Sequence, residues 1–322
     1  MKIAIIGAGM AGVTAARRLQ NCGEVTIFEK SRGAGGRMST RRAEPFEFDH
    51  GAQYFTVKDK RFEKAVKEAV AMGHVEPWNA KGMYHRGDVI EPDTGAGRFV
   101  STPRMNSWVK AMVSDIDLRL NHRVSQLEPD NGLWTLHFDD GKLDRGYDWV
   151  IMAAPPQQVS VLFPDNFEQR ATLSDVKMDA CFALMIGLDD IPDLAWNSLR
   201  HDDGPTAWIA INSDKPGRPV GPTLMVHSGP NWSNAHIDSD RARIMDGMTN
   251  AASLSIGIDL KDAAYHTLHF WRYAAVRNSA SIPCLIDREL KLIAAGDWCL
   301  GGRVEGAYLS GLAAAEALQS CV

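Results

Sequence analysis

The chain has 322 residues, of which 45% are hydrophobic and 23% are charged, and its formal net charge is -5. This composition is typical of a globular protein with one large domain or two modest ones, and the mild acidity argues against a nucleic-acid partner. The five cysteines lie far apart and form no C-x-x-C pair, so zinc, iron–sulfur and disulfide frameworks lack support and a reducing compartment fits best. No segment approaches the roughly 18 apolar residues of a membrane helix, so we expect a cytoplasmic protein with no membrane contact and no metal.

A strand–helix–strand unit opens the chain. Residues 2–6 form a continuous apolar run, which is typical of a parallel strand covered on both faces. Apolar residues recur at helical spacing over residues 10–21, Gly23 ends that helix, and residues 24–29 predict a second strand. A loop rich in glycine and arginine follows at residues 31–40.

The elements after this unit are predicted from their periodicity and turn residues. In chain order they are an amphipathic helix at 60–72, short strands or a hairpin at 84–100, a helix at 104–113, strands at 123–127, 134–138, 149–153, 180–188, 207–212 and 223–228, a helix at 239–254, strands at 264–274 and 291–295, and a helix from about 306 to 318. Nucleotide-binding signals thus flank a strand-rich middle. This order predicts a cofactor domain built from separated segments, with a substrate domain inserted into it.

The first glycine-rich loop has the pattern G-x-G-x-x-G between the predicted strand and helix. Gly7 permits a tight turn, Gly9 lets the backbone approach a pyrophosphate, and Gly12 lets the helix pack on the strand. The amino end of the helix then stabilises the diphosphate charge. Glu29 ends the second strand, where its carboxylate can accept hydrogen bonds from a ribose diol and disfavours a 2′-phosphate. The sequence therefore predicts a dinucleotide site that is not suited to NADP.

A second glycine loop favours FAD over NAD at this site. Residues 32–37 read Arg-Gly-Ala-Gly-Gly-Arg directly after the second strand, where NAD dehydrogenases have no reason for such a loop. In flavoproteins of the amine oxidase class, a loop of the type R-x-G-G-R lies along the diphosphate and its arginine offsets the phosphate charge. The spacing here is one residue longer, so Arg37 matches that arginine better than Arg32 does.

A third element lies near the end of the sequence. Gly296 and Asp297 follow a predicted strand, so the carboxylate can meet a ribityl hydroxyl or one close to the phosphates. The helix expected from about Gly306 can direct its positive end at the flavin N1/C2 carbonyl, where charge appears in reduced flavin. The three elements together predict FAD bound without a covalent link, and no covalent attachment is expected at the nearby Cys299.

Three segments resemble the bacterial renalases, which belong to the flavin amine oxidase superfamily. They are residues 30–39 (KSRGAGGRMS), 49–56 (DHGAQYFT) and 296–311 (GDWCLGGRVEGAYLSG). The likeness runs from end to end and weakens between about residues 163 and 262. It implies oxidation of the 2- and 6-dihydro isomers of NAD(P), with hydride transfer to FAD and reduction of dioxygen to hydrogen peroxide.

The resemblance and the order of the segments predict an α/β fold. We expect a Rossmann-like FAD-binding domain with an inserted α+β substrate domain, as in amine oxidases and hydroxybenzoate hydroxylase. Residues 1–57, 98–162 and 284–322 are expected in the FAD-binding domain, and residues 58–97 and 163–283 in the substrate domain.

The residues expected to bind FAD lie in the three motifs or close to them. They are Gly7, Gly9, Met10, Ala11, Gly12, Glu29, Lys30, Gly35, Gly36, Arg37, Met38, Gln53, Tyr54, Val124, Gly296, Asp297, Glu305, Gly306 and Ala307. No catalytic side chain is assigned, because a dihydropyridine gives up hydride readily and only needs to be held near flavin N5.

Candidates for the substrate pocket come from the segment after the flavin loop and from the face of one strand. Aromatic side chains that alternate along residues 265–274 share a face and could stack on a nicotinamide or wall the flavin. Core packing explains that face equally well. The expected substrate residues are Tyr54, Phe55, Thr56, His269, Trp271 and Tyr273, with His227 and Trp232 as weaker candidates.

Other functions stay open at this point. Amine oxidases of this superfamily often have a lysine over the flavin, and the absence of lysine from residues 266–273 counts against amine oxidation. A desaturase would need a long apolar channel. A non-catalytic protein that binds FAD and acts through a partner is compatible with the same motifs. The expected partners of the enzyme are a small-molecule substrate and dioxygen.

Overall fold

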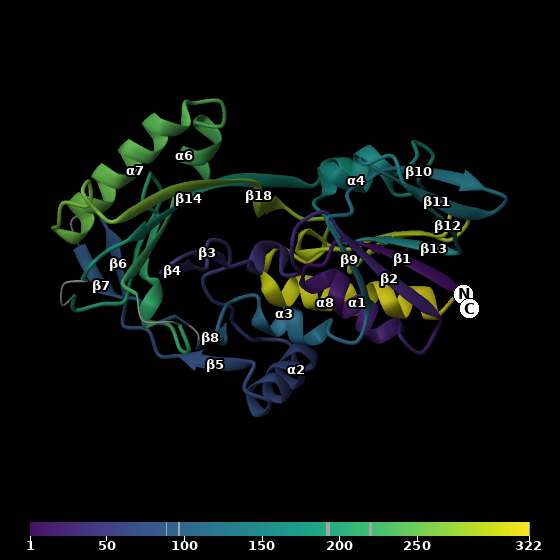
Figure 1. Cartoon of the computed structure of the whole chain (residues 1–322), viewed down its shortest axis with the longest axis horizontal. Coiled ribbons are helices and arrows are strands. Elements are labelled where there is room, and N and C mark those ends of the chain that lie inside the picture. Colours follow the sequence, from purple (N-terminus) through teal and green to yellow (C-terminus); the bar gives the residue numbers. More distant parts are fainter. Residues whose placement is uncertain (88, 96, 191–193, 219–220, 322) are drawn as a thin grey trace.

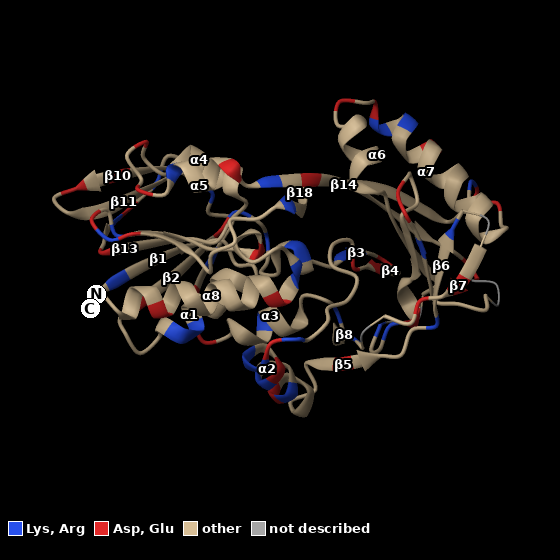
Figure 2. Cartoon of the chain, turned by 180° about the vertical axis from the view of Figure 1, so that it is seen from behind, with Lys and Arg blue, Asp and Glu red and all other residues tan. Residues whose placement is uncertain are grey.

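The computed structural model describes residues 1–87, 89–95, 97–190, 194–218 and 221–321. These form two lobes, joined by the long antiparallel strands β14 (Lys177–Gly187) and β18 (Tyr265–Asn278) (Figure 1). The two ends of the described chain lie next to each other at the far end of one lobe (Figures 1 and 2).

A six-stranded sheet forms the centre of the lobe that holds both ends of the chain. Its order is β19-β20-β13-β1-β2-β9. The strands are β1 (Lys2–Ile6), β2 (Glu24–Glu29), β9 (Asp117–Leu120), β13 (Trp149–Met152), β19 (Leu285–Asp287) and β20 (Leu292–Ala294). All neighbours are parallel except the edge pair of β19 and β20. The order places strands from both ends of the sequence side by side, as expected for a domain built from separated segments.

Both faces of this sheet are covered, which explains the continuous apolar run in β1. Ile3 and Ile5 face a helical layer, while Ala4 and Ile6 face a small antiparallel sheet, because side chains alternate along a strand. The helical layer contains α1 (Met10–Leu19), α2 (Lys60–Ala71), α3 (Ser107–Met112) and α8 (Arg303–Gln319). The small sheet contains β10 (Val124–Asp130), β11 (Leu133–Phe138) and β12 (Leu143–Tyr147).

The second lobe is built on a seven-stranded sheet with the order β18-β14-β17-β16-β15-β6-β7. Its shorter strands are β6 (Gly82–Arg86), β7 (Val89–Pro92), β15 (Ser198–His201), β16 (Trp208–Ile211) and β17 (Thr223–His227). The helices α6 (Pro230–Ala235) and α7 (Arg241–Ile256) lie on one side of this sheet (Figure 1). The hairpin of β3 (Arg41–Ala43) and β4 (Phe46–Phe48) packs on its other face, through Phe46 and Phe48.

The remaining described elements are short. They are β5 (Val75–Trp78), β8 (Arg98–Ser101), α4 (Pro156–Leu162), α5 (Arg170–Asp175) and the single-turn helices η1 (Gly36–Met38), η2 (Asn212–Asp214) and η3 (Asp297–Cys299). The predicted fold class, a Rossmann-like α/β domain with a second α+β domain, is confirmed. No helix among the described residues is long and apolar enough to cross a membrane.

The helix α8 begins at Arg303, three residues before the expected start. Gly301 and Gly302 have left-handed φ angles of 81° and 93° and form the turn before it. Gly306 lies inside the first turns of the helix. We expected the helix to start at a glycine, but the turn that requires glycine comes earlier in the sequence.

The domain boundaries stay a prediction, and the ranges 58–97, 163–283 and 284–322 include residues outside the described ones. Within 58–97, the helix α2 packs against α8, where the rings of Phe62 and Tyr308 lie 5.2 Å apart. We therefore propose that α2 belongs to the cofactor domain.

Candidate functional site

A cavity of about 2020 Å³ lies between the two lobes, at the carboxyl ends of the parallel strands. Residues that follow four of these strands line it, namely Gly7, Lys30, Ala153 and Gly296. The second lobe contributes its wall opposite, and Trp271 on β18 is part of it. Ligands of open α/β sheets bind at this edge, so the cavity is the candidate functional site.

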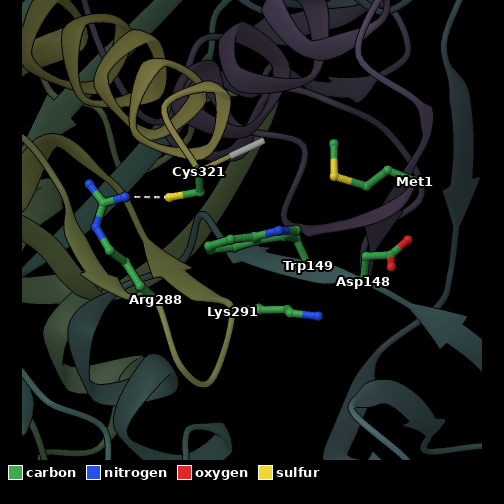
Figure 3. A pocket seen from close by; sticks show the side chains of 6 residues that line it. All are labelled: Met1, Asp148, Trp149, Arg288, Lys291 and Cys321. Atoms are coloured by element: carbon green, nitrogen blue, oxygen red, sulfur yellow. Dashed lines mark hydrogen bonds between the residues drawn. The ribbon is translucent and has the colours of Figure 1, made fainter.

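A shallower pocket of about 630 Å³ lies at the opposite edge of the sheet (Figure 3). Met1 and Lys291 precede β1 and β20, and Trp149 begins β13, so the pocket is at the amino ends of these strands. Arg288 donates a hydrogen bond to Cys321 Sγ there, at 2.7 Å. Open α/β sheets bind their ligands at the carboxyl ends of the strands, so this pocket at the amino ends is not the candidate cofactor site.

The two glycine-rich loops are in direct contact at the edge of the cavity. The Gly35 N–H donates to the Ala8 carbonyl at 2.9 Å, and a Cβ on Gly36 would lie 3.1 Å from the Gly9 Cα. No side chain caps the amino end of α1, so its first N–H groups are available to a ligand. A Cβ on Gly12 would lie 2.0 Å from the Gly7 carbonyl oxygen, so only glycine allows the helix to approach this closely.

The Glu29 carboxylate holds the ends of both loops. It accepts hydrogen bonds from the Ala8 N–H and the Ser31 N–H, each at 2.8 Å, and the residue is only 7% exposed. A carboxylate has about four acceptor positions, so two remain for the hydroxyls of a ribose.

Replacing Glu29 with alanine is expected to weaken FAD binding by about tenfold or more, because charge-assisted hydrogen bonds contribute about 1.5–3 kcal/mol. The measurement is a titration of the apoprotein with FAD. Glu24→Ala, at the exposed start of the same strand, is the matched control and should bind FAD as the wild type does. Equal affinity in both variants would show that the adenosine end of FAD binds elsewhere.

An ion pair joins the second and third sequence motifs. Arg37 Nη1 and Nη2 donate to the two oxygens of Asp297 at 2.8 and 2.6 Å, across 260 positions of sequence. Arg37 also donates to the Ala274 carbonyl at 3.2 Å. Asp297 begins η3, and the following α8 has no side-chain cap at its amino end, where Val304 lines the cavity. The arginine, the carboxylate and the free helix end therefore lie together at the edge of the cavity.

Most of the residues expected to bind FAD line the cavity. They are Gly7, Gly9, Met10, Ala11, Glu29, Lys30, Gly35, Gly36, Arg37, Met38, Val124, Gly296, Asp297 and Ala307. The others are not part of its wall, and they are Gly12, Gln53, Tyr54, Glu305 and Gly306. Glu305 instead accepts hydrogen bonds from the N–H groups of Lys58 and Asp59 at 2.7 and 2.8 Å, which fixes the start of α2.

Residues 54–56 were expected at the flavin or the substrate, but they are not among the described residues that line the cavity. Phe55 is 3% exposed and packs in the core with Phe62 and Trp108. Tyr54 lies 5.5 Å from Trp208, ring to ring, and Thr56 is also absent from the described cavity lining. An isolated β-bridge between Phe55 and Phe99 fixes this arrangement, and such a long-range contact leaves no local signal in the sequence.

Three side chains form what we call the aromatic wall of the cavity, namely His50, His269 and Trp271. The rings of His50 and Trp271 are stacked at 5.2 Å, and the ring of His269 lies edge-on to both, at 4.9 and 4.4 Å. Trp271 Nε1 donates to the His50 carbonyl at 2.8 Å. His227 Nε2 lies 3.2 Å from the same oxygen and also lines the cavity, together with Tyr273.

The histidines around this wall are neutral at pH 7. Burial, with the neighbouring His269 and Arg41, lowers the pKa of His50 to about 3. Burial also lowers the pKa of His227 to about 4, and burial and Arg41 lower the pKa of His269. We did not predict a role for His50, although it lies inside the DHGAQYFT segment. Only its place in that segment marked it, because its stacking on Trp271 and the hydrogen bond from the Trp271 indole are long-range contacts.

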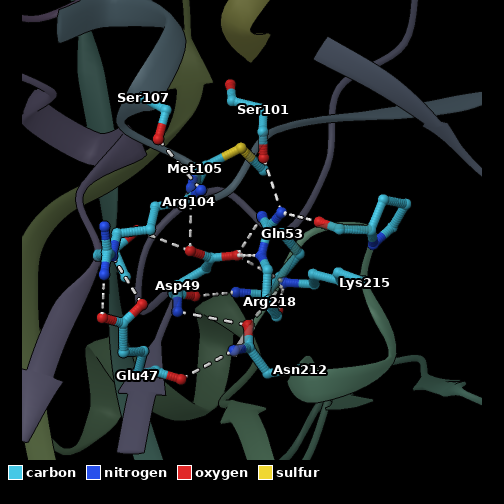
Figure 4. A network of polar contacts seen from close by, with 12 residues as sticks. Glu47, Asp49, Gln53, Ser101, Arg104, Met105, Ser107, Asn212, Lys215 and Arg218 are labelled. Atoms are coloured by element: carbon cyan, nitrogen blue, oxygen red, sulfur yellow. Dashed lines mark hydrogen bonds and ion pairs between the residues drawn. The ribbon is translucent and has the colours of Figure 1, made fainter. Parts of the chain in front are cut away.

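A buried ionic network lies behind this wall, and we call it the Asp49 network (Figure 4). Arg218 donates to Asp49 Oδ2 from Nε at 3.1 Å and from Nη2 at 2.6 Å, and Lys215 Nζ lies 3.5 Å from the same oxygen. Lys215 also donates to Gln53 Oε1 and Asn212 Oδ1, at 3.1 and 3.0 Å. Asp49 and Gln53 lie on either side of Gly51 and Ala52, which contact the Arg37 loop. The other members of the network come from the second lobe. The network therefore fastens the two lobes together.

Burial and the two cations act in opposite directions on the Asp49 carboxyl. Burial alone would raise its pKa, but Lys215 and Arg218 lower it to about 2. For Lys215, burial outweighs the attraction of Asp49 and lowers the pKa to about 8. Asp49 is therefore ionised at neutral pH, and its charge is compensated within the protein.

The residues around the cavity fit a flavin dinucleotide. Four buried polar atoms of cavity-lining side chains have no hydrogen-bond partner, namely His50 Nδ1, Asn106 Oδ1, Gln157 Oε1 and Trp208 Nε1. Such atoms are rarely left unpaired, so a polar ligand is the expected partner. Two uncapped helix ends and a glycine cradle face the same space. Among the described residues, no group of His, Cys, Asp or Glu could hold a metal ion.

Family comparisons agree with this site. A family described as "Flavin containing amine oxidoreductase" matches residues 69–319, and one described as "NAD(P)-binding Rossmann-like domain" matches residues 5–69. The chain therefore belongs to the flavin-containing amine oxidoreductase family. It is an FAD-dependent oxidoreductase, and FAD is its cofactor.

Several solved structures share this fold. Reduced UDP-galactopyranose mutase has a TM-score of 0.78 and 13% identity, and the match covers 100% of this chain and 94% of that one. Wild-type putrescine oxidase bound to putrescine has a TM-score of 0.72 and 11% identity, with 99% of each chain covered. At such identities the likeness is one of fold alone.

Among curated proteins, a 4,4'-diapophytoene desaturase of Staphylococcus aureus (strain Newman) is 48% identical over 60 residues. The match covers 18% of this chain and 12% of that protein. The chain thus matches only a small part of this relative's length.

Proposed function

We propose that the protein is an oxidase of the 2- and 6-dihydro isomers of NAD(P). The isomer, dioxygen and one proton would give NAD(P)+ and hydrogen peroxide. The hydride carries two electrons from the isomer, and dioxygen takes up these two electrons and two protons in all. Bound FAD supplies the hydride acceptor and the reaction with dioxygen. The observation that carries the proposal is the aromatic wall of His50, His269 and Trp271, which offers flat, uncharged surfaces to a dihydropyridine ring.

The electrostatics of the wall support this substrate. A dihydropyridine that loses hydride becomes a positively charged pyridinium. Because His50, His227 and His269 are neutral at pH 7, they do not oppose this charge as protonated histidines would. The reaction needs no general base, so the role of the wall is to orient the ring and exclude water.

We further propose which residues hold FAD. The free N–H groups at the start of α1 would bind the diphosphate, and Glu29 would accept hydrogen bonds from the ribose. Arg37 would offset phosphate charge, with Asp297 as its carboxylate partner beside the start of α8. The roles of the α1 loop, Glu29 and Arg37 are those that the motifs predicted, whereas Asp297 was expected to meet a hydroxyl of the cofactor and is instead paired with Arg37.

The positions of the lysines give less support to the alternative function, amine oxidation. Among the described lining residues of the cavity, the lysines are Lys30 and Lys110, and both are exposed. Lys215 is fully buried in the Asp49 network and does not line the cavity. This arrangement favours a dihydronicotinamide over an amine. The cytoplasmic location of the protein stays a separate prediction from the sequence.

The test is anaerobic stopped-flow absorbance at the flavin maximum. We expect both dihydro isomers to reduce the flavin much faster than ordinary 4-dihydro-NADH or putrescine does. Trp271→Ala should lower the limiting rate by about 10²-fold, because a misplacement of about 1 Å has an effect of that size, while FAD content is kept.

Trp271→Phe is the matched control, because it keeps an aromatic ring and loses only the bond to the His50 carbonyl. We expect it to retain most of the rate. If 4-dihydro-NADH or the amine reduces the flavin faster than both isomers, the proposal is wrong and only the FAD oxidoreductase remains.

A further inference from the structure

The wall of the cavity is strongly basic although the whole chain is acidic. Its described basic residues are Lys30, Arg32, Arg37, Arg41, Arg42, Arg104, Lys110, Arg123, Arg272 and Arg303, and its acidic residues are Glu29, Glu44, Asp139, Asp179 and Asp297. Ten cations against five anions leave an excess of five positive charges, whereas the chain as a whole has a net charge of -5. The two phosphate charges of FAD would neutralise only part of this excess.

Three of these cations form a group that we call the cationic ledge, namely Arg41, Arg42 and Lys110. Arg41 and Arg42 lie on β3, and Lys110 lies on α3. All three side chains line the same cavity, and partial burial together with the charges of Arg42 and Arg104 lowers the pKa of Lys110. Within the described residues, no carboxylate forms an ion pair with a member of the ledge. Arg104, in contrast, is paired with Glu47.

The ledge lies beside the aromatic wall. Arg41 pairs with Phe48 across the β3–β4 hairpin, and the chain reaches His50 two residues after Phe48. The charge of Arg41 also acts on the two histidines of the wall. The FAD diphosphate already has the free end of α1 and Arg37 in the proposed arrangement, so the ledge is a separate basic surface of the same cavity.

We propose that Arg41, Arg42 and Lys110 bind the phosphates of the dinucleotide substrate while its nicotinamide ring lies on the aromatic wall. This inference rests on the proposed function and names the residues that select its substrate. Guanidinium groups present paired N–H donors that match phosphate oxygens, and unpaired cations attract an anionic ligand from a distance. A cationic amine would be repelled by the same surface.

The test uses holoenzyme and the oxidised product NAD+, so that binding is measured without turnover. Calorimetric titration should show that Arg42→Gln and Lys110→Gln each weaken NAD+ binding by about tenfold, and that Arg41→Gln/Arg42→Gln weakens it by about 100-fold. Nicotinamide riboside has the same ring without a phosphate, and we expect equal affinity for the wild type and the variants. FAD content and melting temperature should not change.

Lys64→Gln is the matched control, since it removes one charge from the exposed side of α2, away from the cavity. It should bind NAD+ as the wild type does. Equal NAD+ affinity in the ledge variants, no NAD+ binding by the wild type, or loss of FAD from the variants would each overturn the proposal.

The outcome is separable from that of the proposed function. NAD+ binding that depends on the ledge, in a protein whose flavin is not reduced by either isomer, would support the ledge and refute the oxidase. Rapid reduction by the isomers with ledge-independent binding would do the reverse.

Discussion

Replacing Asp49 with alanine is expected to destabilise the folded protein by about 3–5 kcal/mol, because it leaves buried cations without their counter-charge. The Lys215 and Arg218 side chains are 0% and 2% exposed, so water cannot take the place of the carboxylate. The Thr40 hydroxyl and the Met105 N–H also lose their acceptor, at 2.7 and 3.1 Å. Urea denaturation of the FAD-loaded protein measures the effect.

A surface ion pair provides the control for this prediction. Lys67 and Glu63 are 74% and 46% exposed on α2, so Glu63→Gln should leave the denaturation midpoint almost unchanged. Equal stability of Asp49→Ala and the wild type would mean that water or a compensating shift replaces the carboxylate, and that the network does not fasten the lobes.

The contribution of the Asp49 network also depends on pH. The pKa of Asp49 falls from 3.8 to about 2 on folding, so its contribution is fully present above pH 4 and is lost as the pH falls through 2. Asn cannot titrate. The stability difference between the wild type and Asp49→Asn should therefore shrink as the pH falls below 4.

Replacing Gly51 with alanine is expected to weaken FAD binding by roughly 5–150-fold, the equivalent of about 1–3 kcal/mol of overpacking. A Cβ on Gly51 would lie 2.0 Å from the Arg37 carbonyl oxygen and 2.9 Å from its carbonyl carbon. Backbone atoms cannot rotate away as a side chain would. The substitution therefore separates two segments that the Ala52 N–H to Arg37 carbonyl bond, at 2.8 Å, holds together.

Gly33→Ala is the matched control for Gly51→Ala, because a Cβ on Gly33 would meet no atom within 4 Å. Both variants change one glycine near the same loop, but only one of them creates a clash. Fluorescence titration of the apoproteins with FAD compares them. If both bind FAD equally well, the contact between the two segments does not shape the cofactor site.

The substitutions at Asp49 and Gly51 concern the same part of the chain. Asp49 is held by the buried cations, and Gly51 is pressed against the Arg37 loop, with His50 between them. The position of His50 in turn determines where Trp271 can donate its indole N–H. The contacts between the two lobes thus fix the position of His50 in the aromatic wall. Residues outside the cavity are therefore expected to affect the chemistry inside it.

The sequence by itself determined the strand–helix–strand unit and its glycine loops. The physical reason is that these features are local: an apolar run predicts a covered strand, and a glycine is required wherever backbones approach, as at Gly12. It also predicted that Arg37 and Asp297 belong to cofactor motifs. It did not show that they form an ion pair, because that contact spans 260 positions.

The tertiary structure alone decided which residues of segment 49–56 face the cavity. Periodicity did not distinguish Phe55, which is in the core, from His50, which is in the aromatic wall, because the difference depends on pairing with Phe99 and stacking on Trp271. The charged partners of Asp49 are likewise more than 160 positions away, at Lys215 and Arg218. Burial and charge pairing of this kind exist only after distant strands have docked, so no local pattern in the sequence records them.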